Sequence, residues 1–421
     1  FHGDMSWFRF TFRSSNGRRD KNAQMPARSP LGDSHNFGRR VVSRGARIEK
    51  PRSLFWEWLI LGKESPLRTL LAREAAHHPI GKGAFDFLPS LRFKHPEAIE
   101  GGTVERIELA EIGRMRKGES RILARVVGRA IALFSWLGVS DLHWENVVIG
   151  RSKRGELLFA PIDIEMILAD LPLPTATKLI PDADPEYAAM SRHSAGVRRA
   201  LPFLGKPIDP TDLAAMASAY DATLSFLDDN ASAISDVFSS LPFTEAPIRI
   251  CLRSTEEYVR PPASLWPPFL KEETAQMVRG DVPYFLRLYG KKGIRYFADP
   301  SLRTTKMLPL KGDTPQPDPI LSVARRLRSP SRAMLRNQGL FTLLGAFDHR
   351  SYRGRHAAGE MAITFTRNSF VLTSPNGEIE APRDLRKIVG SVYLPCSCGE
   401  VRSVFVPQVT RCRNFDTLEK P

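Results

Sequence analysis

The sequence predicts an α+β fold, because one long stretch has helical periodicity and several short stretches have strand patterns. Apolar residues recur at helical spacing over 122–137, and Gly138 follows them, which is typical of a long core helix and its end. Two short apolar runs at 147–149 and 157–164 flank a polar turn at 151–155, which indicates a strand, a turn and a second strand. A third observation is the alternation of polar and apolar residues near the C-terminus.

Length and composition place the chain among ordinary globular proteins. Its 421 residues, of which 42% are hydrophobic and 25% charged, suffice for two or three domains. The most apolar stretch, 122–139, contains Arg125 and Arg129, so a membrane span is not expected. The first residues lack the apolar core of a signal peptide. We therefore expect a cytoplasmic protein.

The charge of the chain indicates what kind of partner it binds. A net charge of +15 favours anionic partners such as nucleic acid, ATP or an acidic peptide. Lysine and arginine are spread along the chain and form no stripe interleaved with aromatic residues. For this reason we do not expect nucleic-acid binding.

The cysteines favour reduced, structural thiols. The four residues Cys251, Cys396, Cys398 and Cys412 are too few for a disulfide framework in a chain of this length. The last three could ligate zinc, but they need a fourth ligand and lack the usual Cys-x-x-Cys spacing. Whether they bind a metal stays open at this point.

The N-terminal part of the chain suggests a nucleotide-binding region at 31–112. Residues 1–30 have little periodicity and are expected to be a poorly ordered or truncated lead-in. A glycine-containing turn at 32–40 comes before a strand at 41–43, and Lys50 follows. Backbone N–H groups in such a turn can approach phosphates, and a lysine can neutralise them. Glycine turns and single lysines are common, so this pattern is weak by itself.

The middle of the chain, 113–312, is expected to be mainly helical. Before it, residues 53–77 have a helical pattern that Pro66 interrupts, and 81–102 are expected to form a loop. Further helices are expected at the following positions: 119–138, 211–227 and 231–241.

The remaining part, 313–421, is expected to be a linker and a β-rich C-terminal extension. Residues 311–319 are rich in Pro and Asp, which is typical of a surface linker. Alternating residues at 362–366 and 369–373 predict strands, with a turn at 375–377.

Two groups of acidic and amide residues predict phosphoryl-transfer chemistry. Asp141, His143 and Asn146 follow the long helix in one loop, and the hairpin after them brings Asp163 back beside Asn146. Such a reaction needs Mg²⁺ held by carboxylate and amide oxygens, and a carboxylate that orients the attacking hydroxyl. These residue types are also common in turns and helix caps, so one loop alone would carry little weight.

Several motifs, taken in their order along the chain, resemble the dehydratase domain of class II lanthipeptide synthetases (LanM). The motifs that carry the resemblance span about residues 31–290 and are Gly32-Asp33-Ser34-His35-Asn36, Lys50-Pro51-Arg52, Asp141-Leu142-His143-Trp144-Glu145-Asn146, Asp163-Ile164-Glu165, Arg249 with Arg253, Thr255 and Tyr258, and Gly280-Asp281-Val282-Pro283-Tyr284-Phe285.

The resemblance implies a kinase-like two-lobed fold, related to lipid kinases, with the β-containing region as a small C-terminal extension. It also implies a two-step reaction on a ribosomal precursor peptide that carries a leader sequence. ATP and Mg²⁺ serve to phosphorylate Ser and Thr, and phosphate is then eliminated to leave dehydroalanine or dehydrobutyrine. The chain after residue 290 is too short for the family's cyclase and lacks its Cys-His pair, so a separate cyclase is expected.

The resemblance also implies roles for individual residues. Asp141 would act as base or orienter for the substrate hydroxyl, with His143 supporting its loop, and Lys50 would contact phosphate. The residues implied as Mg²⁺ ligands are Asn146, Asp163 and Glu165. The residues implied in phosphate elimination are Asp33, His35, Arg249 and Thr255. A simpler alternative for Arg249 and Arg253 is a pair of surface salt bridges.

Two other functions remain open from the sequence. A small-molecule kinase of the aminoglycoside or choline phosphotransferase type uses a similar Asp-x-His-x-x-Asn loop followed by an Asp. Such an enzyme has no evident need for Asp33, His35 or the segment from Arg249 to Thr255, so these residues distinguish the two. The other alternative is a catalytically inactive relative that binds a peptide.

Overall fold

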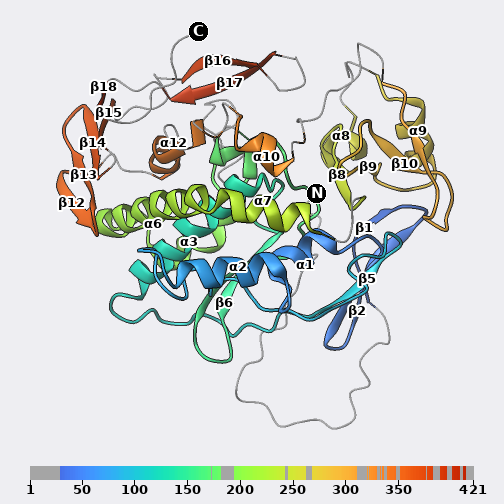
Figure 1. Ribbon diagram of the computed structural model, residues 1–421, viewed down its shortest axis with the longest axis horizontal. Coiled ribbons are helices and arrows are strands. Elements are labelled where there is room, and N and C mark those ends of the chain that lie inside the picture. Colours follow the sequence, from blue (N-terminus) through green and yellow to red (C-terminus); the bar gives the residue numbers. More distant parts are fainter. Residues whose placement is uncertain are drawn as a thin grey trace.

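The computed structural model has a mixed α+β architecture in which several small antiparallel sheets surround a helical core (Figure 1). This confirms the predicted fold class. The residues that the structure describes are 29–171, 173–181, 194–241, 245–261, 268–310, 320, 322–329, 332, 334–335, 339–347, 351–375, 377–382, 389–395, 401–407 and 411–413. The predicted linker at 311–319, the lead-in up to residue 28, Cys396 and Cys398 lie outside them.

The first sheet belongs to the predicted nucleotide-binding region and has the strand order β1-β2-β3-β5-β4. Its strands are β1 (Ser29–His35), β2 (Arg39–Arg44), β3 (Arg47–Lys50), β4 (Phe93–Lys94) and β5 (Gly102–Glu105). The predicted strand at 41–43 is confirmed as part of β2. The prediction of a loop at 81–102 is wrong for the two residues of β4, which are too few to give an alternating pattern.

Two short helices follow this sheet's third strand. They are α1 (Phe55–Leu61) and α2 (Pro66–Ala75), so the predicted break at Pro66 is confirmed. Pro66 occupies the first helical turn, where its missing N–H costs nothing, and Ser65 caps the helix by accepting from the Arg68 N–H.

The helical core is built on α3 (Glu119–Leu137) and α6 (Pro210–Asp229), which run side by side (Figure 1). They approach closely at Gly128, where an added Cβ would collide with the carbonyl oxygen of Met216. Helix α7 (Ala231–Ser239) follows α6, so all three predicted helices are confirmed. The apolar periodicity of the α3 sequence correctly predicted which face of the helix is buried. Gly138 adopts a positive φ and ends the helix.

Shorter elements connect this core to the candidate site. The predicted hairpin is confirmed as β6 (Val147–Arg151) paired with β7 (Leu157–Pro161). Between this hairpin and α6, the described residues include the short helical segments η1 (Pro174–Thr177), η2 (Gly196–Arg199) and α5 (Leu201–Leu204).

A separate four-stranded sheet has the order β11-β10-β9-β8. Its strands are β8 (Pro247–Ile250), β9 (Phe285–Leu288), β10 (Arg295–Phe297) and β11 (Thr305–Met307). Helices α8 (Thr255–Val259) and α9 (Lys271–Val278) lie in the connection between β8 and β9. In Figure 1 this unit lies beside the first sheet.

The C-terminal region packs on the helical core. It contains α10 (Val323–Arg326), α12 (Gly339–Gly345), the paired strands β16 (Val389–Pro395) and β17 (Val401–Pro407), and a sheet of β12 (Gly354–Ala358), β13 (Met361–Phe365), β14 (Ser369–Ser374), β15 (Gly377–Pro382) and β18 (Arg411–Arg413). The two predicted strands are confirmed as β13 and β14. Their buried side chains, such as Ile363 and Phe370, belong to the same core as α3 and α6. Among the helices of the described residues, none has the length and apolar character needed to cross a bilayer.

Candidate functional site

The loop after α3 presents the first acidic residue of the candidate site. Asp141 has a left-handed backbone (φ 64°), which Asp tolerates better than most residues, and its carbonyl oxygen accepts from the Asn146 side-chain amide at 2.9 Å. The Leu142 N–H donates to the Thr177 carbonyl at 2.9 Å, which anchors the loop on η1. The Asp141 carboxylate is 27% exposed and lies 2.7 Å from the Lys178 ammonium. This carboxylate is therefore accessible to a substrate hydroxyl.

His143 supports this loop from within. Its Nδ1 accepts from the Glu145 N–H at 3.3 Å, and its carbonyl accepts from the Asn146 N–H at 2.9 Å. Burial lowers the pKa of His143, and the charges of Asp141 and Glu145 oppose this shift. The structure thus places His143 where the sequence predicted a loop-supporting residue.

Asp163 lies next to the same loop, as the hairpin predicts. The Ile162 N–H donates to the Asn146 carbonyl at 2.9 Å, which sets Asp163 one residue away from that contact. The Asn146 Nδ2 is bound to Asp141, so its Oδ1 is left for another partner. The Asp163 carboxylate is 35% exposed. Its Oδ1 pairs with Arg52, which leaves its Oδ2 and the Asn146 amide oxygen without a hydrogen-bond partner in the described part of the chain.

Lys50, at the end of β3, lies in a buried group of charges with Glu57 of α1. Its ammonium contacts the Glu57 carboxylate at 2.8 Å, the Asp163 carboxylate at 3.5 Å, and the Ile162 carbonyl. Burial lowers the pKa of Lys50 to about 8, although the charge of Glu57 opposes the shift. A phosphate beside this ammonium would favour its protonated form.

Glu165 is the most tightly bound acid of the site. Its Oε1 pairs with Arg249, and its Oε2 lies 3.1 Å from Arg52 and 3.4 Å from the Tyr284 hydroxyl. Burial would raise the pKa of Glu165, but the charges of Arg249 and Arg52 outweigh it and hold the pKa at about 2. The expectation that Glu165 ligates Mg²⁺ is therefore revised, because both of its oxygens are engaged by protein donors.

A metal ion at this site would have few protein ligands. Across the described ranges, no three His, Cys, Asp or Glu side chains gather closely enough to hold a metal ion by themselves. Mg²⁺ usually takes only one or two carboxylates and completes its shell with water and substrate phosphates. Asp163 and the Asn146 amide oxygen fit that pattern.

His35, at the end of β1, lies against the Glu165 group. Its Nδ1 is 2.9 Å from the Val282 carbonyl, so Nδ1 carries the hydrogen and Nε2 keeps its lone pair in the neutral ring. Its ring packs edge-on against Tyr284, with centroids 5.9 Å apart. Burial and the charge of Arg249 lower the pKa of His35, while Glu165 and the exposed Asp33 act in the opposite direction.

The glycine turn is occupied by a carboxylate of the protein itself. Asp281, which is 4% exposed, accepts from the Ser34 hydroxyl at 2.8 Å, the Phe37 N–H at 2.8 Å and the Gly38 N–H at 2.9 Å. The prediction that these N–H groups approach phosphate is therefore corrected. A turn with several positive φ angles forms an anion cradle, and here Asp281 fills it.

Thr255 makes no hydrogen bond or ion pair with the other predicted residues in the described part of the chain. It begins the exposed helix α8 next to its cap, Ser254, and its hydroxyl has no hydrogen-bond partner in the described part of the chain. The alternative of a surface salt bridge does not hold for Arg253. It pairs at 3.1 Å with Glu273, and both side chains are buried. Arg249 is likewise paired and only 13% exposed.

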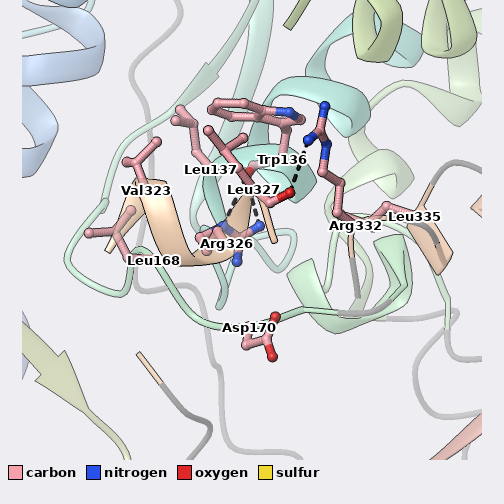
Figure 2. Close-up of a pocket in the computed structure, with 9 residues that line it drawn as sticks. All are labelled: Trp136, Leu137, Leu168, Asp170, Val323, Arg326, Leu327, Arg332 and Leu335. Carbon is pink, nitrogen blue, oxygen red and sulfur yellow. Dashed lines mark hydrogen bonds between the residues drawn. The ribbon is translucent and has the colours of Figure 1, made fainter. Parts of the chain in front are cut away.

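The C-terminal segment contacts the end of α3, which leads into the Asp141 loop (Figure 2). The guanidinium of Arg326 donates to the carbonyls of Ser135 and Trp136 at the end of α3, at 3.0 and 2.7 Å, and to the carbonyl of Ala169. A cation at a helix C-terminus satisfies the last carbonyls and the helix dipole. Arg326 thereby connects the segment that leads to Asp141 with the segment that follows Glu165.

Sequence reasoning assigned no role to several residues that shape the site. Glu57 and Lys178 belong to none of the motifs named above. Arg52, Asp281 and Tyr284 belong to such motifs but were assigned no role of their own. Glu57 could have been found as an acid one helical turn into the helix that follows Lys50. Lys178 lies in a segment without a pattern, so no signal pointed to it.

Comparison with protein-family models finds no match, and a search of curated proteins finds no similar sequence.

Replacing Asp281 by Asn should loosen the turn that carries His35. The amide has a donor where the carboxylate has an acceptor, so at least one N–H or O–H of the turn loses its partner, at a cost of about 2 kcal/mol. Urea unfolding should show this loss, and the Phe37 and Gly38 amides should exchange hydrogen faster. Asp33→Asn, at an exposed position of the same turn, is the control. Equal stability of the two variants would contradict the assignment.

Stability should fall in acid as Glu165 becomes protonated. Its folded pKa lies below the ordinary value, so its contribution is present above about pH 4.5 and is lost as the pH falls towards 2; the shift corresponds to about 3 kcal/mol. Glu165→Gln should therefore be less stable than wild type at pH 7, and the difference should shrink between pH 4.5 and 2. Glu145→Gln, at an exposed acid, is the control. A difference that does not depend on pH would contradict this account.

Proposed function

We propose that the protein dehydrates Ser and Thr residues of a precursor peptide in an ATP-dependent reaction, by phosphorylation and then elimination of phosphate. One observation carries the proposal. Arg52 contacts both Asp163, a residue of the first step, and Glu165, which pairs with Arg249, a residue of the second step. The groups needed for both steps thus belong to one charged network, which one bound peptide can meet.

The proposed fold relationship is to lipid and protein kinases. The sheet β1–β5 with α1 would form the smaller lobe, and the part built on α3 and α6 the larger one. The pairing of Lys50 with Glu57 supports this, because protein kinases hold a strand lysine with a helix glutamate beside the nucleotide phosphates. Lys50 also lies 3.5 Å from Asp163, as a phosphate-binding lysine next to a metal-binding acid should.

In the first step, Asp141 accepts the proton of the peptide hydroxyl. The hydroxyl oxygen then bonds to the γ-phosphorus of ATP, and the bond from that phosphorus to ADP breaks. Lys178 keeps the Asp141 carboxylate oriented at the surface, and Lys50 supplies positive charge to the phosphates. Asn146 and Asp163 are the residues that would hold Mg²⁺, which neutralises charge on the transferred phosphate when it is bound.

In the second step, His35 removes the Cα proton of the phosphorylated residue. The electrons of that C–H bond form the double bond to Cβ, the Cβ–O bond breaks, and phosphate leaves. His35 suits this role because its lowered pKa keeps it neutral near pH 7, with the lone pair on Nε2. Arg249 uses Nη1 for Glu165 and lies over the Tyr284 ring, while its guanidinium makes no other hydrogen bond in the described part of the chain. Its Nη2 is therefore available to a phosphate oxygen.

The first step depends on Asp163. Asp163→Asn should lower phosphorylation of a precursor peptide at least about 100-fold, since one metal-binding oxygen is lost where charge develops. Mass spectrometry after incubation with ATP and Mg²⁺ measures this: wild type should give peptide lighter by one water per site. Glu145→Gln, at an exposed acid of the neighbouring loop, should be unchanged. Phosphate transfer to a small metabolite with no peptide requirement would favour the small-molecule kinase instead.

The second step can be separated from the first through Thr255 and Arg249. Thr255→Ala should accumulate phosphopeptide. The variant should be as stable as wild type, because the Thr255 side chain is exposed and makes no hydrogen bond within the described residues. Arg249→Lys should do the same, since lysine keeps the charge beside Glu165 but loses the planar fork that binds phosphate. The neighbouring exposed position gives the control, Glu256→Ala. Normal elimination by both variants would remove these residues from the second step.

A further inference from the structure

A hollow of about 210 Å³ lies on the helical core, away from the residues discussed so far. Four segments enclose it: the loop after α2, helix α3, helix α6, and the turn between β12 and β13. The lining residues are Pro79, Ile80, Arg125, Arg129, Ala215, Ser218, Ala219, Ala222, Ala358 and Gly359. The C-terminal extension thus supplies one wall.

The hollow exists because one face of α6 carries only small side chains. Ala215, Ser218, Ala219 and Ala222 have the i, i+3, i+4, i+7 spacing that aligns residues along a helix. No side chain of α6 is therefore long enough to fill the space. Gly359, with φ 61°, turns the chain so closely that an added Cβ would lie 3.4 Å from the Ser218 hydroxyl.

Two arginines of α3 face this space, and neither forms an ion pair within the described residues. Arg125 and Arg129 are one helical turn apart, and no described carboxylate lies within 4.0 Å of either. In the described part of the chain, the Arg129 guanidinium makes long bonds to the carbonyls of Ala84 (3.3 Å) and Ile80 (3.4 Å), and its buried Nε has no hydrogen-bond partner. Burial and the like charge of Arg125 lower the pKa of Arg129, and the more distant charge of Asp86 only partly opposes this shift. Like charges at this spacing repel each other, and an anion between them would offset that repulsion.

The preceding turn of the same helix shows the contrast. Arg121 is also exposed to solvent, but it has an acidic partner, Asp212 of α6, at 3.4 Å. The fold therefore places an acid opposite one arginine of this helix and leaves a hollow opposite the next two.

We infer that this hollow binds an oxyanion, a phosphate or carboxylate group carried on a small molecule. Two guanidiniums can grip its oxygens, the Ser218 hydroxyl is a further donor, and Pro79 and Ile80 offer an apolar wall for the carrier. The volume of the hollow suits an anionic group with a small body. The inference does not rest on the proposed function, because no residue of that reaction lines the hollow.

The test measures protection of individual arginines in the full-length protein. Phenylglyoxal modifies accessible arginines. Peptide mapping by mass spectrometry reports the rate of modification at Arg125 and Arg129, and the rate at Arg121 is the internal control. Inorganic phosphate at ten times its dissociation constant should slow modification of Arg125 and Arg129 about tenfold. Sodium chloride at equal ionic strength should not slow the modification. Acetate in place of phosphate shows whether a carboxylate is enough to protect the two arginines.

Filling the hollow gives an independent check. Ala222→Phe keeps both arginines but occupies the space, so phosphate should no longer protect them, while Ala222→Ser should behave as wild type. Equal protection of Arg121, or protection that survives in Ala222→Phe, would show that phosphate meets only surface charge and would overturn the inference. The wild-type experiment decides the question by itself if a variant fails to fold.

Discussion

The candidate site depends on the pairing of one buried carboxylate, Glu165, with two arginines from different parts of the chain. A buried charge without a partner costs several kcal/mol, so Arg52, Glu165 and Arg249 are stable in this environment only as a group. Arg52 extends the group to Asp163 and Glu57, and Lys50 completes it. The result is a network of three cations, Lys50, Arg52 and Arg249, and three carboxylates, Glu57, Asp163 and Glu165.

This balance of charge limits what the site can bind. Because the three cations are already neutralised by the three carboxylates, a polyphosphate entering the network adds negative charge that the protein alone does not offset. A nucleotide at this site would therefore need its own cation, and the partly exposed Asp163 with the Asn146 amide oxygen is where that cation would fit. The charge balance and the sparse metal ligands are thus two consequences of one arrangement.

The sequence was sufficient for features that depend on neighbouring residues. The periodicity of α3, the break at Pro66 and the β6–β7 hairpin are local, and the hairpin alone brings Asp163 beside Asn146. The partners of Glu165 could not be predicted, since Arg249 is 84 residues away in the sequence. Nothing in the Asp-x-Glu pattern shows whether its glutamate binds a metal ion or an arginine. The glycine turn was misinterpreted for the same reason, because the acid that fills it comes from 244 residues further along the chain.

In the described part of the chain, three groups that attract anions are closed by the protein's own carboxylates. Asp281 fills the cradle of N–H groups in the glycine turn, Glu273 neutralises the buried Arg253, and Asp212 meets Arg121. Such internal acids stabilise the fold and at the same time prevent foreign anions from binding there. Arg125 and Arg129 differ from these groups, because small side chains leave space where an acid would stand. They also differ from Arg326, whose guanidinium is satisfied by the carbonyls of Ser135, Trp136 and Ala169. With a hollow beside them in place of an acid, an external anion is the simplest partner for the two arginines.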